Sequence, residues 1–193
     1  MSARLLSFTL LPVLFLSVVM AGRPVSATQT EIVLQQGHLD EVLAVDYSPD
    51  GRMLASAGEL QHIKLWDAQT GDLIRTLPGH ADRIRSLAFH PDGRRLASCD
   101  MSGGVKLWDV TDGRLIHHFT NHTGFTRSLA FNRDGRTVTV GSTDKKLSFW
   151  DVESGALLRS LPMTEELAHV LFTPDGQYLV TASREGKNPV VRF

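Results

Sequence analysis

The sequence predicts an all-β fold in which antiparallel sheets of four strands repeat along the chain. Two kinds of landmark recur in steps of 42 residues: histidines at 38, 80 and 122, and tryptophans at 66, 108 and 150. Turn glycines keep the same step at 51, 93 and 135, and Gly176 follows 41 residues later. A period of about 40–45 residues marked by Gly-His and Trp-Asp pairs is typical of β-propeller blades. We therefore expect about four blades, forming an open arc of a larger ring.

Each repeat contains four short strand patterns separated by turn residues. A nearly continuous apolar run comes first and is typical of an inner strand that is buried on both faces. Pro91-Asp92-Gly93 follows it in the second repeat, where Pro sets φ at the first corner and Gly accepts a positive φ. The expected strands of this repeat are Ile84–Phe89, Leu96–Cys99, Val105–Trp108 and Leu115–Phe119.

The same patterns divide the rest of the chain. We expect an outer strand that completes a blade at residues 28–36, then blade one at 37–78, blade two at 79–120, blade three at 121–162 and an incomplete blade four at 163–193. The third strand of blade four, Val190–Phe193, stops one residue before the expected Trp-Asp pair. This favours an N-terminal fragment over a ring of four blades closed by residues 31–36.

Residues 1–27 have the features of an export signal. Arg4 supplies the positive start, residues 5–20 are mainly apolar, and Val25-Ser26-Ala27 places small residues before a cleavage site. A membrane span needs about 20 apolar residues, and this run is shorter, so a cleaved signal is favoured over an uncleaved anchor. We expect a mature chain that starts at Thr28, is secreted or periplasmic, and has no membrane association after cleavage.

Composition and motifs exclude several functions. The chain has 20 Lys plus Arg, 21 Asp plus Glu and a net charge of −1, which gives no reason to expect nucleic acid. It contains no nucleophile elbow, zinc-protease helix, phosphate-binding loop or dinucleotide fingerprint, so we expect no enzyme activity and no cofactor. The recurring histidines belong to different blades and do not converge on one ion, so we expect no metal site. The single cysteine, Cys99, cannot form an intrachain disulfide.

With these landmarks, Glu31 to Phe193 resembles the WD-repeat β-propeller family, in the style of its exported bacterial members. The resemblance implies a hydrogen-bonded network in each blade that joins the histidine, a Ser or Thr on the second strand, an aspartate in the next turn, and the tryptophan. Such a network supplies the acceptor that a buried indole N–H needs. The residues expected in these networks are His38, Ser56 and Trp66 in blade one, His80, Ser98 and Trp108 in blade two, and His122, Asp144 and Trp150 in blade three.

No blade shows the complete set in the sequence. Leu60 and Ser102 stand at the aspartate positions of blades one and two, and Val140 replaces the serine of blade three. We expect the affected donors to find water, Glu59 or Asp100 instead, and the networks to be weaker than the family pattern.

One inner strand also carries an unexpected charge. Asp46 stands where the other repeats have Ala88, Ala130 and Leu171. A buried carboxylate there needs a donor.

The resemblance also implies that partners bind on the face formed by the loops that lead into the inner strands. The candidate partner-binding residues are Glu41, Arg83, Arg85, Phe125 and Arg127. Arginine and aromatic side chains are common interface anchors, and the arginines favour an acidic protein or peptide; an ordinary polar rim is the alternative.

We expect a non-catalytic binding scaffold. The alternative is the sensing part of a longer enzyme, protease-like or kinase-like, whose catalytic domain lies beyond residue 193. Self-association by sharing blades is a further expectation for a chain this short.

Overall fold

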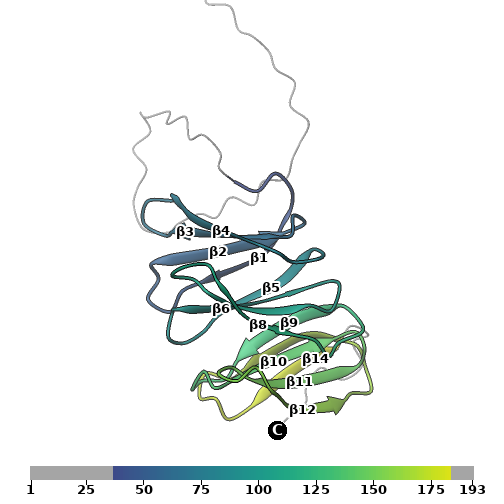
Figure 1. Cartoon of the computed structure of the whole chain (residues 1–193). Helices are drawn as coiled ribbons and strands as arrows, with labels where there is room; N and C mark the ends of the chain where they lie inside the picture. The colour runs from purple at the N-terminus through teal and green to yellow at the C-terminus, as the bar shows by residue number, and fades with distance from the viewer. Residues whose placement is uncertain (1–36, 184–193) are drawn as a thin grey trace, which may run out of the picture. The chain divides into compact units, whose positions relative to one another are not determined.

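A computed structural model describes residues 37–183 of the chain, and every regular element within them is a β-strand. The strands form antiparallel sheets that follow one another in chain order, three of four strands and one of two (Figure 1). The all-β, blade-like fold and its open arc are therefore confirmed. The expected signal segment, the outer strand at 28–36 and the strand at 190–193 lie outside the described residues.

We call the sheets blades one to four. Blade one consists of β1 (Val42–Tyr47), β2 (Met53–Gly58), β3 (His62–Asp67) and β4 (Leu73–Pro78). Blade two consists of β5 (Ile84–Phe89), β6 (Arg95–Asp100), β7 (Val105–Asp109) and β8 (Leu115–Phe119). Blade three consists of β9 (Thr126–Phe131), β10 (Thr137–Ser142), β11 (Lys146–Asp151) and β12 (Leu157–Pro162). Blade four contains β13 (Leu167–Phe172) and β14 (Leu179–Ser183).

The turn after each inner strand has the chemistry that its sequence predicts. In blade one, Gly51 N–H donates to the Ser48 carbonyl across 2.8 Å, and Gly51 has a φ of 69°. Glycine adopts this left-handed conformation without the steric cost that a side chain brings. Asp50 Oδ1 accepts from Arg52 N–H at 3.0 Å and fixes the second half of the turn.

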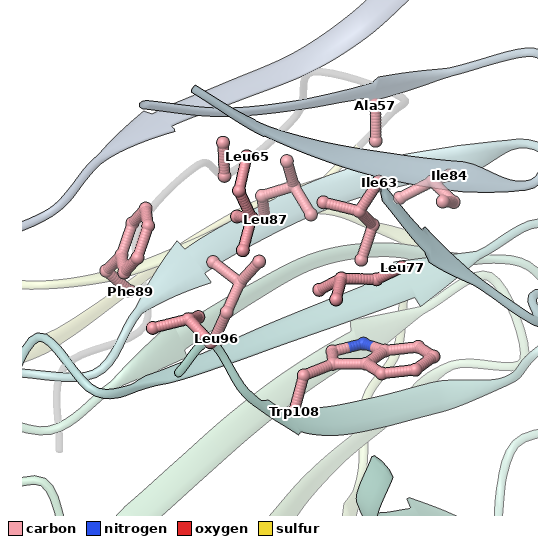
Figure 2. Packing of buried hydrophobic residues seen from close by; sticks show 11 residues of the cluster. Ala57, Ile63, Leu65, Leu77, Ile84, Leu87, Phe89, Leu96 and Trp108 are labelled. Atoms are coloured by element: carbon pink, nitrogen blue, oxygen red, sulfur yellow. The ribbon is translucent and has the colours of Figure 1, made fainter. Parts of the chain in front are cut away.

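Consecutive blades pack face to face. We call the face of a blade toward the preceding blade its leading face, and the opposite face its trailing face. Figure 2 shows the first junction, where Leu87, Leu96 and Trp108 on the leading face of blade two pack with Ile63 and Leu77 of blade one. Equivalent apolar clusters join blade two to blade three and blade three to blade four. Burial of these repeated faces is the main source of stability that the fold offers.

Polar bonds between inner strands accompany this packing. Asp46 Oδ2 accepts from Phe89 N–H at 2.6 Å, and Ser128 Oγ accepts from Val170 N–H at 3.0 Å. Burial raises the pKa of Asp46, and the bond from Phe89 N–H offsets part of that rise. The unexpected carboxylate of β1 therefore links blade one to blade two.

Candidate partner-binding site

Each inner strand contains one β-bulge near its start. In blade two, Ile84 pairs with Asp100 and Ser86 pairs with Cys99, so Arg85 has no partner on β6. A bulged residue leaves the ladder, and its side chain is aimed differently from those of its neighbours. The equivalent residues of the other blades are Leu43, Arg127 and Ala168.

The bulged residues of blades one to three line a hollow of about 250 Å³. We call it the bulge hollow, and its lining residues are Glu41, Leu43, Glu59, Arg83, Arg85, Met101, Phe125 and Arg127. All five candidate residues from the sequence are in this set. The structure thus brings together side chains from three blades that are separated by as many as 86 positions, from Glu41 to Arg127.

The charges of the bulge hollow are unevenly paired. Arg83 Nη1 lies 3.0 Å from Glu59 Oε1, so one arginine is neutralised at the rim. Arg85 and Arg127 have no acceptor or acidic partner within residues 37–183, and Arg127 Nε is buried without a hydrogen bond. An arginine fork is well suited to a carboxylate, which it can bind through two parallel hydrogen bonds. The hollow therefore offers two cationic groups to an anion.

Apolar side chains form the rest of the hollow. Leu43 and Met101 are half-buried, and Phe125 is exposed. Pockets for small molecules usually enclose about 300–1,000 Å³, so this hollow has room only for one or two side chains of a larger partner. The bulge hollow thus combines two cationic groups with an apolar lining.

Besides Leu43, the bulged residue of blade one, two lining residues were not among the candidate residues from the sequence: Glu59 and Met101. Both follow the second strand of their blade, β2 or β6, and antiparallel pairing brings that end beside the bulge of the inner strand. The positions of Glu59 and Met101 could have been predicted from the sequence, because the end of the second strand lies opposite the start of the first in any antiparallel hairpin.

Blade two contains a complete buried network. Trp108 Nε1–H donates to Ser98 Oγ at 2.8 Å, Ser98 Oγ–H donates to His80 Nε2 at 2.6 Å, and His80 Nδ1–H donates to Asp100 Oδ2 at 2.7 Å. One histidine tautomer satisfies all three bonds. The expectation that Asp100 serves in place of an aspartate at position 102 is confirmed in blade two, and the network there is complete, which the sequence pattern did not show.

The Asp100 carboxylate is held by several donors besides His80. Ser102 donates from both its N–H (2.9 Å) and its hydroxyl (2.6 Å), and Gly104 N–H donates at 2.9 Å. Burial raises the pKa of Asp100, but the bonds from His80 and Ser102 outweigh it and hold the pKa well below its usual range. Burial lowers the pKa of His80, although Asp100 acts against this shift. The imidazole is therefore neutral at pH 7 and accepts the Ser98 proton.

Comparison with known proteins agrees with this architecture. Three WD domain, G-beta repeat matches cover residues 29–67, 71–109 and 113–151, together more than half of the chain. The chain belongs to the WD-repeat family. A curated relative, "Periodic tryptophan protein 2" of Arabidopsis thaliana, is 41% identical over 44 residues, which are 23% of this chain and 5% of that protein. The matched segment thus spans a small part of that relative. The WD repeats of this chain support a role in protein interaction.

The side chains of Ser98, His80 and Asp100 are hydrogen-bonded in the same order as a catalytic triad, but they are not accessible to a substrate. All three are buried. Ser98 Oγ is already held between Trp108 and His80, and none of the three lines the bulge hollow. A substrate carbonyl cannot reach a nucleophile in this position, so the constellation is structural.

The other WD repeats have incomplete networks. In blade one, Ser56 Oγ contacts His38 Nε2 at 2.8 Å and Trp66 Nε1 at 2.7 Å, but Leu60 stands where a carboxylate would follow.

Blade three has the carboxylate of the network but lacks the bridging hydroxyl. His122 Nδ1 lies 3.1 Å from Asp144 Oδ2, whereas His122 Nε2 and Trp150 Nε1 are buried without a partner in the described part of the chain. Val140 occupies the position of Ser98 and cannot bridge them.

The remaining chemistry of residues 37–183 is sparse. No group of three or more His, Cys, Asp or Glu side chains there could hold a metal ion. Cys99 is buried, and burial raises its pKa to about 12, so the thiol is unreactive at neutral pH. The same part of the chain contains no helix that could cross a membrane.

Proposed function

We propose that this WD-repeat chain is a non-catalytic scaffold that binds a protein or peptide through the bulge hollow. The observation that carries the proposal is the gathering of Arg85 and Arg127, both without acceptors among the described residues, beside the exposed Phe125. Buried or half-buried arginines and aromatics are the side chains that most often anchor interfaces.

The partner that suits this hollow is acidic. A carboxylate placed between Arg85 and Arg127 would supply the hydrogen-bond acceptors that both guanidinium groups lack. A neighbouring apolar side chain would contact Leu43 and Phe125. Nucleic acid is a poorer candidate, because the chain has a net charge of −1 and Glu41 and Glu59 line the same hollow.

Selection from a random peptide library displayed on phage tests the proposal. We expect the full chain to enrich peptides in which Asp or Glu adjoins a large apolar residue, and the Arg85→Ala/Arg127→Ala variant to lose that enrichment. Arg52→Ala/Arg136→Ala is the matched control, because these exposed arginines follow turn glycines and do not line the hollow. Failure of the unaltered chain to enrich any peptide family, or equal enrichment by the hollow variant, would contradict the proposal.

We also propose that the scaffold is exported, with cleavage after Ala27 and release to a secreted or periplasmic location. The support is the sequence of residues 1–27 alone. N-terminal sequencing of the native product would show Thr28 if the signal is removed, whereas an intact Met1 would favour the uncleaved anchor.

A second candidate function is the sensing part of a longer enzyme. The support is that a similar WD segment makes up only 5% of the Arabidopsis relative, so such repeats do occur inside much larger proteins. The intact mass of the native product, captured with an antibody to blade one, separates the two functions. A mass equal to residues 28–193 would contradict the longer enzyme, and a much larger mass would support it.

A further inference from the structure

The bulge hollow is acidic on one side and basic on the other. Within residues 37–183, the charged lining residues of blade one are both acidic: Glu41 and Glu59. The charged lining residues of blades two and three are all arginines: Arg83, Arg85 and Arg127. Glu41 and Arg83 hold the same place in successive repeats, 42 residues apart and directly before an inner strand. A partner that covers the whole hollow therefore meets both signs of charge.

Backbone contacts bring the two glutamates of blade one to the same rim of the hollow. Glu59 N–H donates to the Glu41 carbonyl at 3.1 Å, and a β-carbon on Gly58 would collide with that carbonyl. Asp100 stands at the place of Gly58 in blade two, opposite the first residue of the inner strand. Glycine thus allows the start of β1 and the end of β2 to approach closely, and both carry a carboxylate next to this contact.

The described part of the chain neutralises one of these two carboxylates. Arg83 Nη1 lies 3.0 Å from Glu59 Oε1. The Glu41 side chain is exposed and has no ion pair or hydrogen bond within residues 37–183. A free carboxylate at the rim of a binding hollow favours a cationic group on the partner and repels a further anion.

We propose that the partner segment carries both charges: a Lys or Arg that pairs with Glu41, and the acidic residue that Arg85 and Arg127 hold. This inference rests on the proposed function, and it makes Glu41 the residue that selects the basic side chain. A segment with several acidic residues and no base binds less well, because its further carboxylates meet Glu41 and Glu59. Such a rim charge determines which partner binds more than how tightly it binds, since one exposed ion pair contributes little free energy.

Selection by the full chain from a random peptide library displayed on phage shows the two charge preferences separately. The unaltered chain should enrich peptides in which a Lys or Arg lies within a few positions of the acidic and apolar residues. Glu41→Lys should still enrich the acidic and apolar residues but lose the basic one. Asp72→Lys is the matched control and should select the same peptides as the unaltered chain. Asp72 is an exposed acid of blade one in the turn between β3 and β4, at the end of the sheet away from the hollow.

Fluorescence anisotropy with the most enriched peptide then measures the pairing with Glu41. Replacing the basic residue of the peptide by Glu should weaken binding to the unaltered chain about fivefold at low salt, the effect of one exposed ion pair. The same replacement should strengthen binding to Glu41→Lys, and circular dichroism should show that this variant is folded.

The outcomes distinguish this inference from the proposed function. Enriched peptides that contain the acidic and apolar residues without a basic one would overturn the inference and leave the proposed function standing. Loss of the basic residue with Asp72→Lys would also overturn it, because the preference would then follow the net charge of the chain. Failure of the unaltered chain to enrich any peptide family would overturn both.

Discussion

His80 Nδ1 lies 2.7 Å from Asp100 Oδ2, and this bond completes the buried chain from Trp108 through Ser98 to a carboxylate. Its consequence is that every buried polar atom in the centre of blade two has a partner. Such a fully satisfied network adds rigidity where a partly satisfied one costs free energy. We therefore expect the core of blade two to be the most rigid among the described blades.

Removing Trp108 tests the importance of this network and of the packing around it. We expect Trp108→Ala to lower the free energy of unfolding by about 3–5 kcal/mol, because it leaves a large cavity between blades one and two and removes one of the two hydrogen bonds of Ser98 Oγ. Urea unfolding followed by circular dichroism measures the change. A loss below about 1 kcal/mol would be inconsistent with a buried tryptophan at this junction.

Exchanging the bridging residues of blades two and three tests the hydrogen bonds separately from the packing. Ser98→Val should cost about 2–4 kcal/mol, because it leaves Trp108 Nε1 and His80 Nε2 buried without partners. Val140→Ser should stabilise the protein by about 1 kcal/mol, because a hydroxyl there would meet the unpaired Trp150 Nε1 and His122 Nε2. Urea unfolding of both variants beside the unaltered protein gives the two values. Destabilisation by both substitutions would show that side-chain volume, and not hydrogen bonding, decides at this position.

Acidic pH should destabilise the fold through its network histidines. Burial lowers the pKa of His38, His80 and His122 from the ordinary 6.5, so each binds fewer protons when folded than when unfolded. Their contribution to stability is complete above pH 6.5 and is lost as the pH falls below it. Asp46, whose pKa burial raises from 3.8, acts in the opposite direction just above pH 3.8, so Asp46→Asn should steepen the loss of stability there. Urea midpoints that stay constant between about pH 7 and 5 would contradict this behaviour.

Much of the fold could be predicted from the sequence because its landmarks are local. A turn such as Pro49-Asp50-Gly51 fixes where one strand ends and the next begins, and the 42-residue step repeats that information along the chain. The candidate residues Arg85 and Arg127 could also be found, since they hold equivalent places in successive repeats.

The positions of the β-bulges that bring Arg85 and Arg127 into one hollow could not be predicted in the same way. A bulge at Arg85 depends on how β5 registers with β6, and the residue pattern alone does not set that register. The sequence indicated Asp100 only as a substitute acceptor for the network of blade two. Whether a carboxylate contacts the histidine depends on where its side chain points across the turn, and sequence position alone does not give that direction. His90 gave no signal at all, although its Nε2 lies 2.8 Å from the Gly135 carbonyl of the next blade.

Binding of a display-selected peptide to charge-reversed protein is the most direct test of the proposed scaffold role. Fluorescence anisotropy would compare the unaltered chain with Arg85→Glu/Arg127→Glu, and with Arg52→Glu/Arg136→Glu as the control. We expect the hollow variant to remain folded and to lose at least about 30-fold in affinity, the effect of leaving a peptide carboxylate beside two like charges. The control should bind as the unaltered chain does. Equal affinity of all three proteins would contradict the assignment of the bulge hollow as the partner-binding site.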